Sequence, residues 1–169
     1  RVKAEYSQLP EVRNIAATSH VPGEGNVWGW DVRKNMEDEK YEAHWFAADE
    51  NYIDCMGLEL IAGTNFPENM SSENEKFIIA SEMILDQFQL GDPHEAIGST
   101  LILGDSSLVE IIGVIKNFQH VALFLNQRPV ILRYVPSSYN HAFLRLESPD
   151  MLSTMEKLEN SWKKIDPYH

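Results

Sequence analysis

Six histidines are the residues of this chain best suited to metal binding or proton transfer. None is spaced four residues from another or from the single cysteine as in a short zinc-binding segment. We therefore expect separate surface or core histidines, and no metal or other cofactor. The six are His20, His44, His94, His120, His141 and His169.

Cys55 is the only thiol, so no intrachain disulfide can form. It lies in a short apolar segment beside Ile53 and Met56, next to Asp54, and no Lys, Arg or His lies within a helical turn of it. A nucleophilic cysteine needs a stabilised thiolate. We expect Cys55 to be buried and unreactive.

Acidic pairs are the remaining candidates for general acid–base chemistry. They fall in polar loops or at a helix start, where carboxylates favour solvent or the positive end of the helix. Glycoside hydrolysis needs two carboxylates held in a cleft at a set separation, so we expect these pairs to be solvated. They are Glu37 with Glu39, Asp49 with Glu50, and Glu73 with Glu75.

Glycine-rich and modification motifs are equally weak. Residues 23–25 (Gly-Glu-Gly) place an acid where a phosphate would bind, so they predict a turn. No Gly-x-Ser-x-Gly elbow, phosphate loop or dinucleotide fingerprint occurs. Residues 69–71 (Asn-Met-Ser) match a glycosylation acceptor in a predicted loop. The motifs taken together predict a protein that is not an enzyme.

The charge balance excludes another class of function. The chain of 169 residues carries a net charge of -12, and its Lys and Arg are scattered. Nucleic-acid binding draws on a concentrated basic patch, and an acidic surface repels anionic lipids. We expect neither nucleic acid nor a lipid surface as a partner.

Hydrophobic periodicity predicts an α+β (mixed α/β) chain. The last helix is the clearest: Ser148 is its expected N-cap, and residues 151–165 carry an apolar stripe that should face the core, including Met151 and Met155. Asp49 and Ser81 are expected N-caps, and Gly57 an expected left-handed stop. Helices are predicted near 1–9, 49–57, 81–90 and 148–165, and strands near 12–17, 26–33, 41–48, 58–62, 77–80, 100–103, 108–115, 130–135 and 142–147.

Four segments in a fixed order resemble one family. Residues 9–13 (Leu-Pro-Glu-Val-Arg) lead into a Pro-Gly turn at 22–23, and residues 48–63 with Asn65-Phe66 follow a Tyr, then Gly-x-x-Leu-x-x-Gly pattern. Residues 77–82 with the Gly91–Gly98 turn and residues 109–120 complete the order. Together they resemble the MacB-like periplasmic core domain of FtsX/MacB-type ABC transporter permeases. Thr64 and Asn117 stand where the family commonly has Arg and Asp.

The resemblance implies a single extracytoplasmic domain over residues 1–169 with two lobes. One is a split β-α-β porter-like lobe from about 1–66 and 128–169, and the smaller inserted lobe covers about 67–127. It implies flanking membrane helices on the periplasmic side of the bacterial inner membrane, and a start at Arg1 without Met agrees with an excised fragment.

The same resemblance implies partners and a mechanical function. These are a second permease copy and a cytoplasmic ABC ATPase, with a periplasmic adaptor, outer-membrane channel, lipoprotein or peptide according to subfamily. ATP hydrolysis would drive export, lipoprotein release or partner activation. The free domain is expected to be a monomer.

Two questions stay open at this level. Trp28, Trp30, Phe124 and Leu125 are candidates for a partner surface, but each could equally be core. An alternative function is an extracytoplasmic sensor that binds a peptide antibiotic or small solute between the lobes, and a further one is a hydrolase with a dispersed site.

Overall fold

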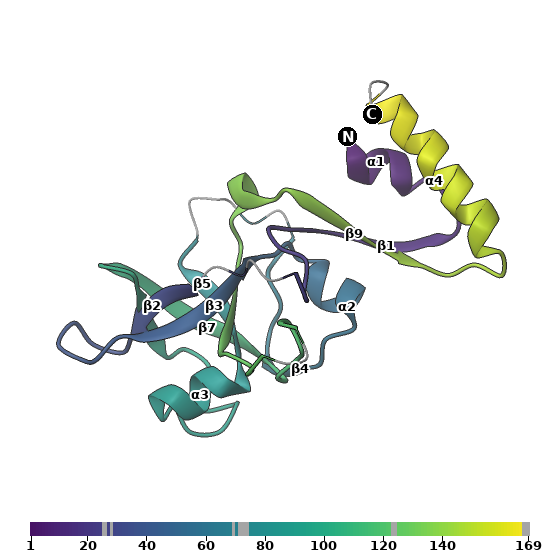
Figure 1. The fold of residues 1–169 in the computed structure, drawn as a ribbon. Coiled ribbons are helices and arrows are strands. Elements are labelled where there is room, and N and C mark those ends of the chain that lie inside the picture. Colours follow the sequence, from purple (N-terminus) through teal and green to yellow (C-terminus); the bar gives the residue numbers. More distant parts are fainter. Residues whose placement is uncertain (25–26, 28, 69, 71–74, 123–124, 167–169) are drawn as a thin grey trace.

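The computed structural model describes residues 1–24, 27, 29–68, 70, 75–122 and 125–166. Helices and strands alternate irregularly, which confirms the predicted α+β class (Figure 1). The elements are α1 (Val2–Tyr6), β1 (Val12–Thr18), β2 (Gly29–Arg33), β3 (Tyr41–Ala47), α2 (Tyr52–Met56), β4 (Leu60–Gly63), β5 (Phe77–Ser81), α3 (Glu82–Phe88), β6 (Thr100–Leu103), β7 (Ser107–Ile115), β8 (Val130–Arg133), the short 3₁₀ helix η2 (Pro136–Ser138), β9 (His141–Leu146) and α4 (Met151–Ile165).

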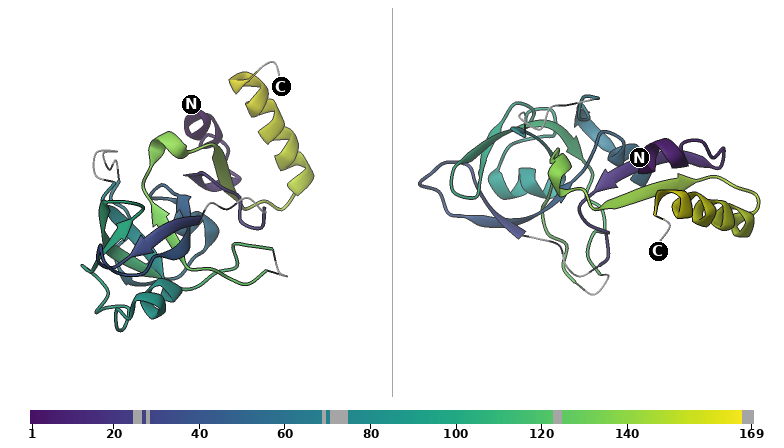
Figure 2. Two further views of the ribbon diagram at one scale, coloured as in Figure 1. Left: turned by 60° about the vertical axis from the view of Figure 1, so that its left-hand side comes forward. Right: turned by 90° about the horizontal axis from the view of Figure 1, so that it is seen from above.

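The larger sheet closes on itself. Its order is β4-β7-β5-β8-β3-β2-β6, and β6 pairs again with β7. β7 is nine residues long, so one of its edges pairs first with β6 and then with β4. Strands β7, β5, β8, β3, β2 and β6 therefore form a barrel, which the view from above in Figure 2 shows as a ring. Closure leaves these six strands with few free edges.

The barrel core follows from the alternation of its strands. Ala43 and Trp45 of β3 point into the same apolar cluster as Ile131 of β8 and Ile111 of β7. Ile84, Leu85 and Phe88 of α3 join it at the end where β8 begins, because Ser81 Oγ accepts a hydrogen bond from the Val130 N–H. A cluster of this kind is stabilised by about 1.5–3 kcal/mol for each large side chain it buries.

The second unit is a two-stranded ribbon covered by two helices. β1 and β9 pair antiparallel, with Thr18 opposite His141 at one end. Tyr6 of α1, Ile15 of β1 and Leu158 of α4 form its small core. Figure 1 shows α1 and α4 side by side, each near one end of the chain. We call α1, β1, β9 and α4 the ribbon unit.

A third apolar cluster joins the ribbon unit to the barrel. It contains Ala16 from β1, Phe46 from β3, Tyr52 and Ile53 from α2, and Leu132 from β8. Each of these residues is at most 3% exposed. A two-stranded sheet is marginal alone in water, so this shared cluster, which we call the joint core, stabilises the ribbon unit against the barrel.

Strand pairing does not follow the predicted lobe boundaries at residues 67 and 127. β2, β4 and β8, expected in the first lobe, pair with β6, β7 and β5 respectively, which were expected in the inserted lobe. The division into lobes stays a prediction. The strand pairing favours a different division, in which the ribbon unit, built from both ends of the chain, is one lobe and residues 29–133 are the other.

The last helix exists as predicted, but its cap and its buried face differ. Asp150 is the N-cap, and its Oδ1 accepts a hydrogen bond from the Ser153 N–H at 3.2 Å, so the prediction of Ser148 is wrong. Met151 and Met155 are exposed, as is Trp162, which corrects the expected core face. The narrow ribbon and the short α1 cover only part of the helix, mainly at Leu158.

The three other predicted helix-terminal residues, Gly57, Asp49 and Ser81, had mixed outcomes. Gly57 ends α2 in the left-handed region at φ 67°, as expected. Asn51, not Asp49, is the N-cap of α2. Ser81 does precede α3, but its side chain bonds to β8 instead of capping the helix.

Candidate functional site

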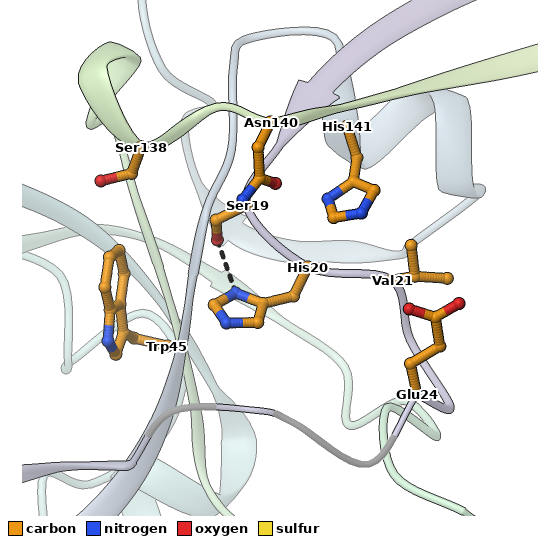
Figure 3. A pocket seen from close by; sticks show the side chains of 8 residues that line it. All are labelled: Ser19, His20, Val21, Glu24, Trp45, Ser138, Asn140 and His141. Carbon is orange, nitrogen blue, oxygen red and sulfur yellow. Dashed lines mark hydrogen bonds between the residues drawn. The ribbon is translucent and has the colours of Figure 1, made fainter.

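Four of the histidines gather where the ribbon unit meets the barrel. The ring of Phe46 lies 5.7 Å from that of His20 and 5.9 Å from that of His120, centroid to centroid. His44 packs edge-on against His120 at 5.1 Å. His141 lies beside His20 in Figure 3. The expectation of separate histidines is wrong here, because pairing of distant strands brings them together.

The His44–His120 contact has defined proton positions. His120 Nδ1 lies 3.3 Å from the Phe118 carbonyl oxygen, which only accepts, so Nδ1 carries the proton. His120 Nε2 then accepts from His44 Nδ1–H across 2.9 Å. Burial lowers the pKa of both rings; for His44 the Glu42 carboxylate opposes this, and the Arg128 charge adds to it. Both imidazoles are therefore neutral at pH 7.

A cavity of about 410 Å³ lies beside His20 and His141, where the ribbon unit meets the barrel. Ser19 and His20 come directly after β1, Asn140 and His141 meet the start of β9, and Trp45 lies on β3. The cavity thus sits where both chain segments cross from ribbon to barrel (Figure 3). We call this cavity the joint cavity. The residues that line it are Ser19, His20, Val21, Glu24, Trp45, Ser138, Asn140 and His141.

Hydrogen bonds position the ring of His20. The Ala47 N–H donates to Ser19 Oγ at 2.9 Å, and the same Oγ lies 2.7 Å from His20 Nδ1. Burial, followed by the charge of His141, lowers the pKa of His20. This ring is also neutral at pH 7.

Trp45 is held in place at the mouth of the barrel by a stack of cationic and aromatic side chains. The Arg133 guanidinium lies 4.7 Å from the Trp30 ring and 5.3 Å from the Trp45 ring, and the two indoles are 5.6 Å apart. Arg133 is 6% exposed, and burial lowers its pKa; its guanidinium lies 3.7 Å from the Glu75 carboxylate. Cation–π packing of this kind rigidifies both indoles.

Two of the four residues predicted to form a partner surface, Trp30 and Leu125, lie among the described residues. Trp30 belongs to this stack and is 36% exposed. Leu125 is 48% exposed and lines a hollow of about 370 Å³ with His44 and Arg128. Trp28 and Phe124 lie outside the described residues. A role in partner binding stays a prediction for all four.

The other candidate groups have varied surroundings. Cys55 is half-buried, its thiol donates to the Phe143 carbonyl at 3.6 Å, and burial raises its pKa, which agrees with an unreactive thiol. Glu37 and Glu39 are exposed as expected. His169, Asn69, Ser71, Glu73 and Gly25 lie outside the described residues, while Gly23 adopts the predicted turn at φ 89°.

Asp49 is the exception among the acids, since it is 3% exposed instead of solvated. Its Oδ2 accepts the Ala17 N–H at 2.8 Å and pairs with Lys3 Nζ at 2.7 Å. Asp49 thereby ties the end of β3 to β1 and α1. Its role is structural and lies in the joint.

No family model matches the chain, and no curated protein is similar enough to count as a match. Solved structures do match. The periplasmic region of MacB from Actinobacillus actinomycetemcomitans superposes with a TM-score of 0.70 at 13% identity, covering 97% of this chain and 72% of that one. The chain has the MacB-type periplasmic fold.

Two further structures share the MacB-type fold. The extracellular domain of the noncanonical ABC-type transporter YknZ from Gram-positive bacteria gives a TM-score of 0.66 at 14% identity, covering 96% of this chain and 80% of that one. A domain of a putative permease from Porphyromonas gingivalis gives 0.64 at 17% identity, covering 95% and 73%. These likenesses confirm the resemblance at the level of the fold.

Among the residues that the structure describes, no helix of this MacB-type chain is long and apolar enough to cross a membrane. Within the same residues, no group of three or more His, Cys, Asp or Glu side chains is placed to hold a metal ion.

Sequence reasoning missed the joint cavity and the histidine cluster. A signal existed for part of it: His20 follows the first predicted strand and His141 precedes the last. Pairing those two strands antiparallel would have placed both histidines at one end of the ribbon. Nothing in the sequence indicated that His44 and His120 would share a hydrogen bond.

Proposed function

We propose that this chain is a non-catalytic extracytoplasmic domain of a bacterial ABC transporter permease. It would transmit movement driven by ATP hydrolysis in a cytoplasmic ATPase to export, lipoprotein release or activation of a periplasmic partner. The observation that supports this is the MacB-type fold over 95–97% of the chain. The three similar structures are named as the periplasmic region of MacB, the extracellular domain of an ABC-type transporter and a domain of a putative permease.

The arrangement of the two units suits such a function. α1 and α4 lie side by side, linked by an ion pair between Glu5 and Lys164, and Lys157 of α4 pairs with Glu11, which directly precedes β1. Movement applied to these helices would pass through β1 and β9 into the joint core and the barrel. Packed units with a joint between them are what rigid-body transmission requires.

Partner contacts would lie on surfaces outside these cores. We place a second permease copy and an adaptor, channel, lipoprotein or peptide among the partners. The Leu125 hollow, with Phe124 beside it in sequence and Trp28 and Trp30 in the early hairpin, is the proposed contact region. Leu125 supports this because an exposed apolar side chain beside Arg128 fits the mixed character of interfaces.

A distance measurement in the full-length protein tests the proposal. Met155 is exposed on α4, so a Met155→Cys variant takes one spin label per copy once Cys55 and any cysteine outside residues 1–169 are replaced by Ser. With its ATPase in lipid vesicles, we expect the label-to-label distance between two copies to change when ATP and vanadate are added. An ATPase-dead partner is the control.

An unchanged distance with an active ATPase would refute mechanical coupling. Labelling of the same cysteine in intact cells by a membrane-impermeant thiol reagent tests the location. Protection of the cysteine until the inner membrane is opened would refute the extracytoplasmic placement.

A second candidate is an extracytoplasmic sensor domain. The observation that favours it is the joint cavity, since a ligand between the two units would bind one relative arrangement of them better than another. The transporter and sensor functions are compatible, because a domain that transmits movement can also respond to a ligand bound between its two units.

A further inference from the structure

α4 carries a row of exposed apolar side chains beside its buried face. Met155 lies four residues after Met151 and seven before Trp162, which places these three side chains along one side of the helix. Leu152 lies next to them on the solvent side. Between 38% and 82% of each side chain is exposed in this row, which we call the α4 stripe and which consists of Met151, Leu152, Met155 and Trp162.

We propose that the α4 stripe lies on the surface of a phospholipid bilayer, with its side chains among the headgroups. Helices that bind such a surface are amphipathic, have a low mean hydropathy, and carry Trp and Leu on one side and Lys on the other. α4 is amphipathic with a low mean hydropathy, and the helical period places Lys157 and Lys164 opposite the stripe. The proposal does not depend on the permease function.

The distribution of charge allows the ribbon unit, rather than the barrel, to approach a lipid surface. Residues 1–18 and 141–166, which span the ribbon unit, carry seven basic and seven acidic side chains. The net charge of -12 therefore falls on residues 19–140, which include the barrel. The expectation of no lipid partner used the net charge of the whole chain, so its physical reason applies to the barrel and not to the ribbon unit.

The position of α4 in the molecule suits contact with a flat surface. Figure 1 and the view from above in Figure 2 both show α4 at the opposite end of the molecule from the barrel. A planar bilayer can therefore touch this helix while the acidic barrel stays away from the headgroups. Salt screens charges beyond roughly 8 Å at physiological ionic strength, so the barrel then adds little repulsion.

Glu159 is the acidic side chain of α4 closest to the stripe along the helix surface, and it is not a lone charge. Its carboxylate pairs with Lys163 at 2.7 Å, one turn further along the helix. Both side chains are largely exposed, and long charged side chains beside an apolar stripe can extend their heads into water. The stripe can thus enter the headgroup region without the cost of an unpaired buried carboxylate.

Fluorescent labels on two sides of α4 test the proposal. The chain is tethered by a C-terminal hexahistidine tag to phosphatidylcholine vesicles that contain a nickel-chelating lipid, because a few partly exposed side chains bind only weakly without a tether. An environment-sensitive fluorophore is attached to Met155→Cys or to Asn160→Cys, each combined with Cys55→Ser. Asn160 is exposed and faces away from the stripe on the same helix, so it is the matched control.

We expect contact with the bilayer at position 155 alone. The fluorescence there should shift to the blue, and lipids brominated in the acyl chain should quench it several-fold more strongly than the fluorescence at position 160.

Variants of the stripe show whether its apolar side chains cause the contact. Replacing Met151 and Leu152 together by Ser should reduce the quenching at position 155, since both side chains are exposed and available to the bilayer. Met36→Ser removes a methionine that is 58% exposed on the barrel hairpin, and it should leave the quenching unchanged. None of the three residues belongs to an apolar core cluster, so these variants should fold, which circular dichroism verifies.

Four results would overturn the proposal. The first two are equal quenching at positions 155 and 160, and no quenching at 155. The third is a blue shift at 155 that brominated lipids do not quench and that grows with the density of chain on the vesicle, because a second copy of the chain would then cover the stripe. The fourth is quenching that persists in full after Met151 and Leu152 are replaced. None of these outcomes bears on the transporter proposal, which depends on movement driven by ATP.

Discussion

His120 and His44 share one hydrogen bond that only neutral imidazoles can make. Protonation of His120 Nε2 would set two N–H groups against each other across 2.9 Å. His120 is 1% exposed, and Phe118, Phe46 and the neighbouring histidine surround it. Acid therefore acts on the joint at a site where water cannot easily solvate the new charge.

A pH-dependent loss of stability follows for the pair. Burial lowers the pKa of His120 below its value in the unfolded chain, so the unfolded chain binds the proton more readily. Stability is full above about pH 6.5 and falls as the pH drops toward the lower folded pKa, with His120 contributing at most about 1.4 kcal/mol per pH unit. Urea unfolding across this range should show that slope, and His120→Gln should reduce it.

The exposed His94 provides the control for this titration. His94→Gln should leave the slope as it is in the parent chain. If His120→Gln retains the full slope, other groups carry the acid sensitivity and the role of the pair is disproved.

Asp49 gives a second prediction at this scale. Asp49→Ala would leave the Ala17 N–H without its acceptor and Lys3 without its closest carboxylate. We expect a loss of about 1–3 kcal/mol in the free energy of unfolding, the cost of an unsatisfied buried group. Glu37→Ala, on the exposed hairpin, should change it by less than about 0.5 kcal/mol. Equal effects would show that Asp49 is not a tie of the joint.

Residue-level roles were the least predictable from sequence. Asp49 was expected to be solvated and the histidines separate, because both judgements used only neighbours along the chain. The contacts that decide them, with Ala17 and between His44 and His120, join residues far apart in sequence. For Cys55 the expected full burial was wrong, since the side chain is half-buried, but its apolar neighbours still raise the pKa of the thiol.

Element existence was predictable because it depends on local pattern. Alternation in residues 142–147 and 108–115 and the spacing in 151–165 gave β9, β7 and α4 close to their observed bounds. The barrel closure was not predictable, because it depends on β6 and β4 sharing one edge of β7. The buried face of α4 was misjudged for a related reason: the pattern shows which face is apolar but not how wide its partner is.

Two substitutions on α4 test which of its apolar side chains are buried. Leu158 packs in the ribbon core with Tyr6 and Ile15, so Leu158→Ala should destabilise the chain by about 2–4 kcal/mol. Met155 is 54% exposed, so Met155→Ala should cost less than about 0.5 kcal/mol. Thermal melts of the two variants provide the measurement. A comparable loss for Met155→Ala would mean that the apolar stripe is buried after all.

At the scale of the whole molecule, the barrel and the ribbon unit differ in the size of their apolar cores. The barrel cluster has sixteen buried residues, whereas the ribbon core has Tyr6, Ile15 and Leu158. Local opening follows the amount of buried apolar contact. The ribbon unit should therefore open more readily than the barrel, and its connection through the joint core decides how far that opening spreads.

Native-state hydrogen exchange measures this difference directly. Amides of α1 and α4 should exchange at a lower opening free energy than those of β5 and β7, and Leu158→Ala should widen the gap by lowering protection in α1 and α4 alone. If the substitution instead lowers protection of β5 and β7 by the same amount, ribbon and barrel open as one cooperative unit. That outcome would contradict the expected independent opening of the ribbon unit, because the joint core would then couple the stability of the two units completely.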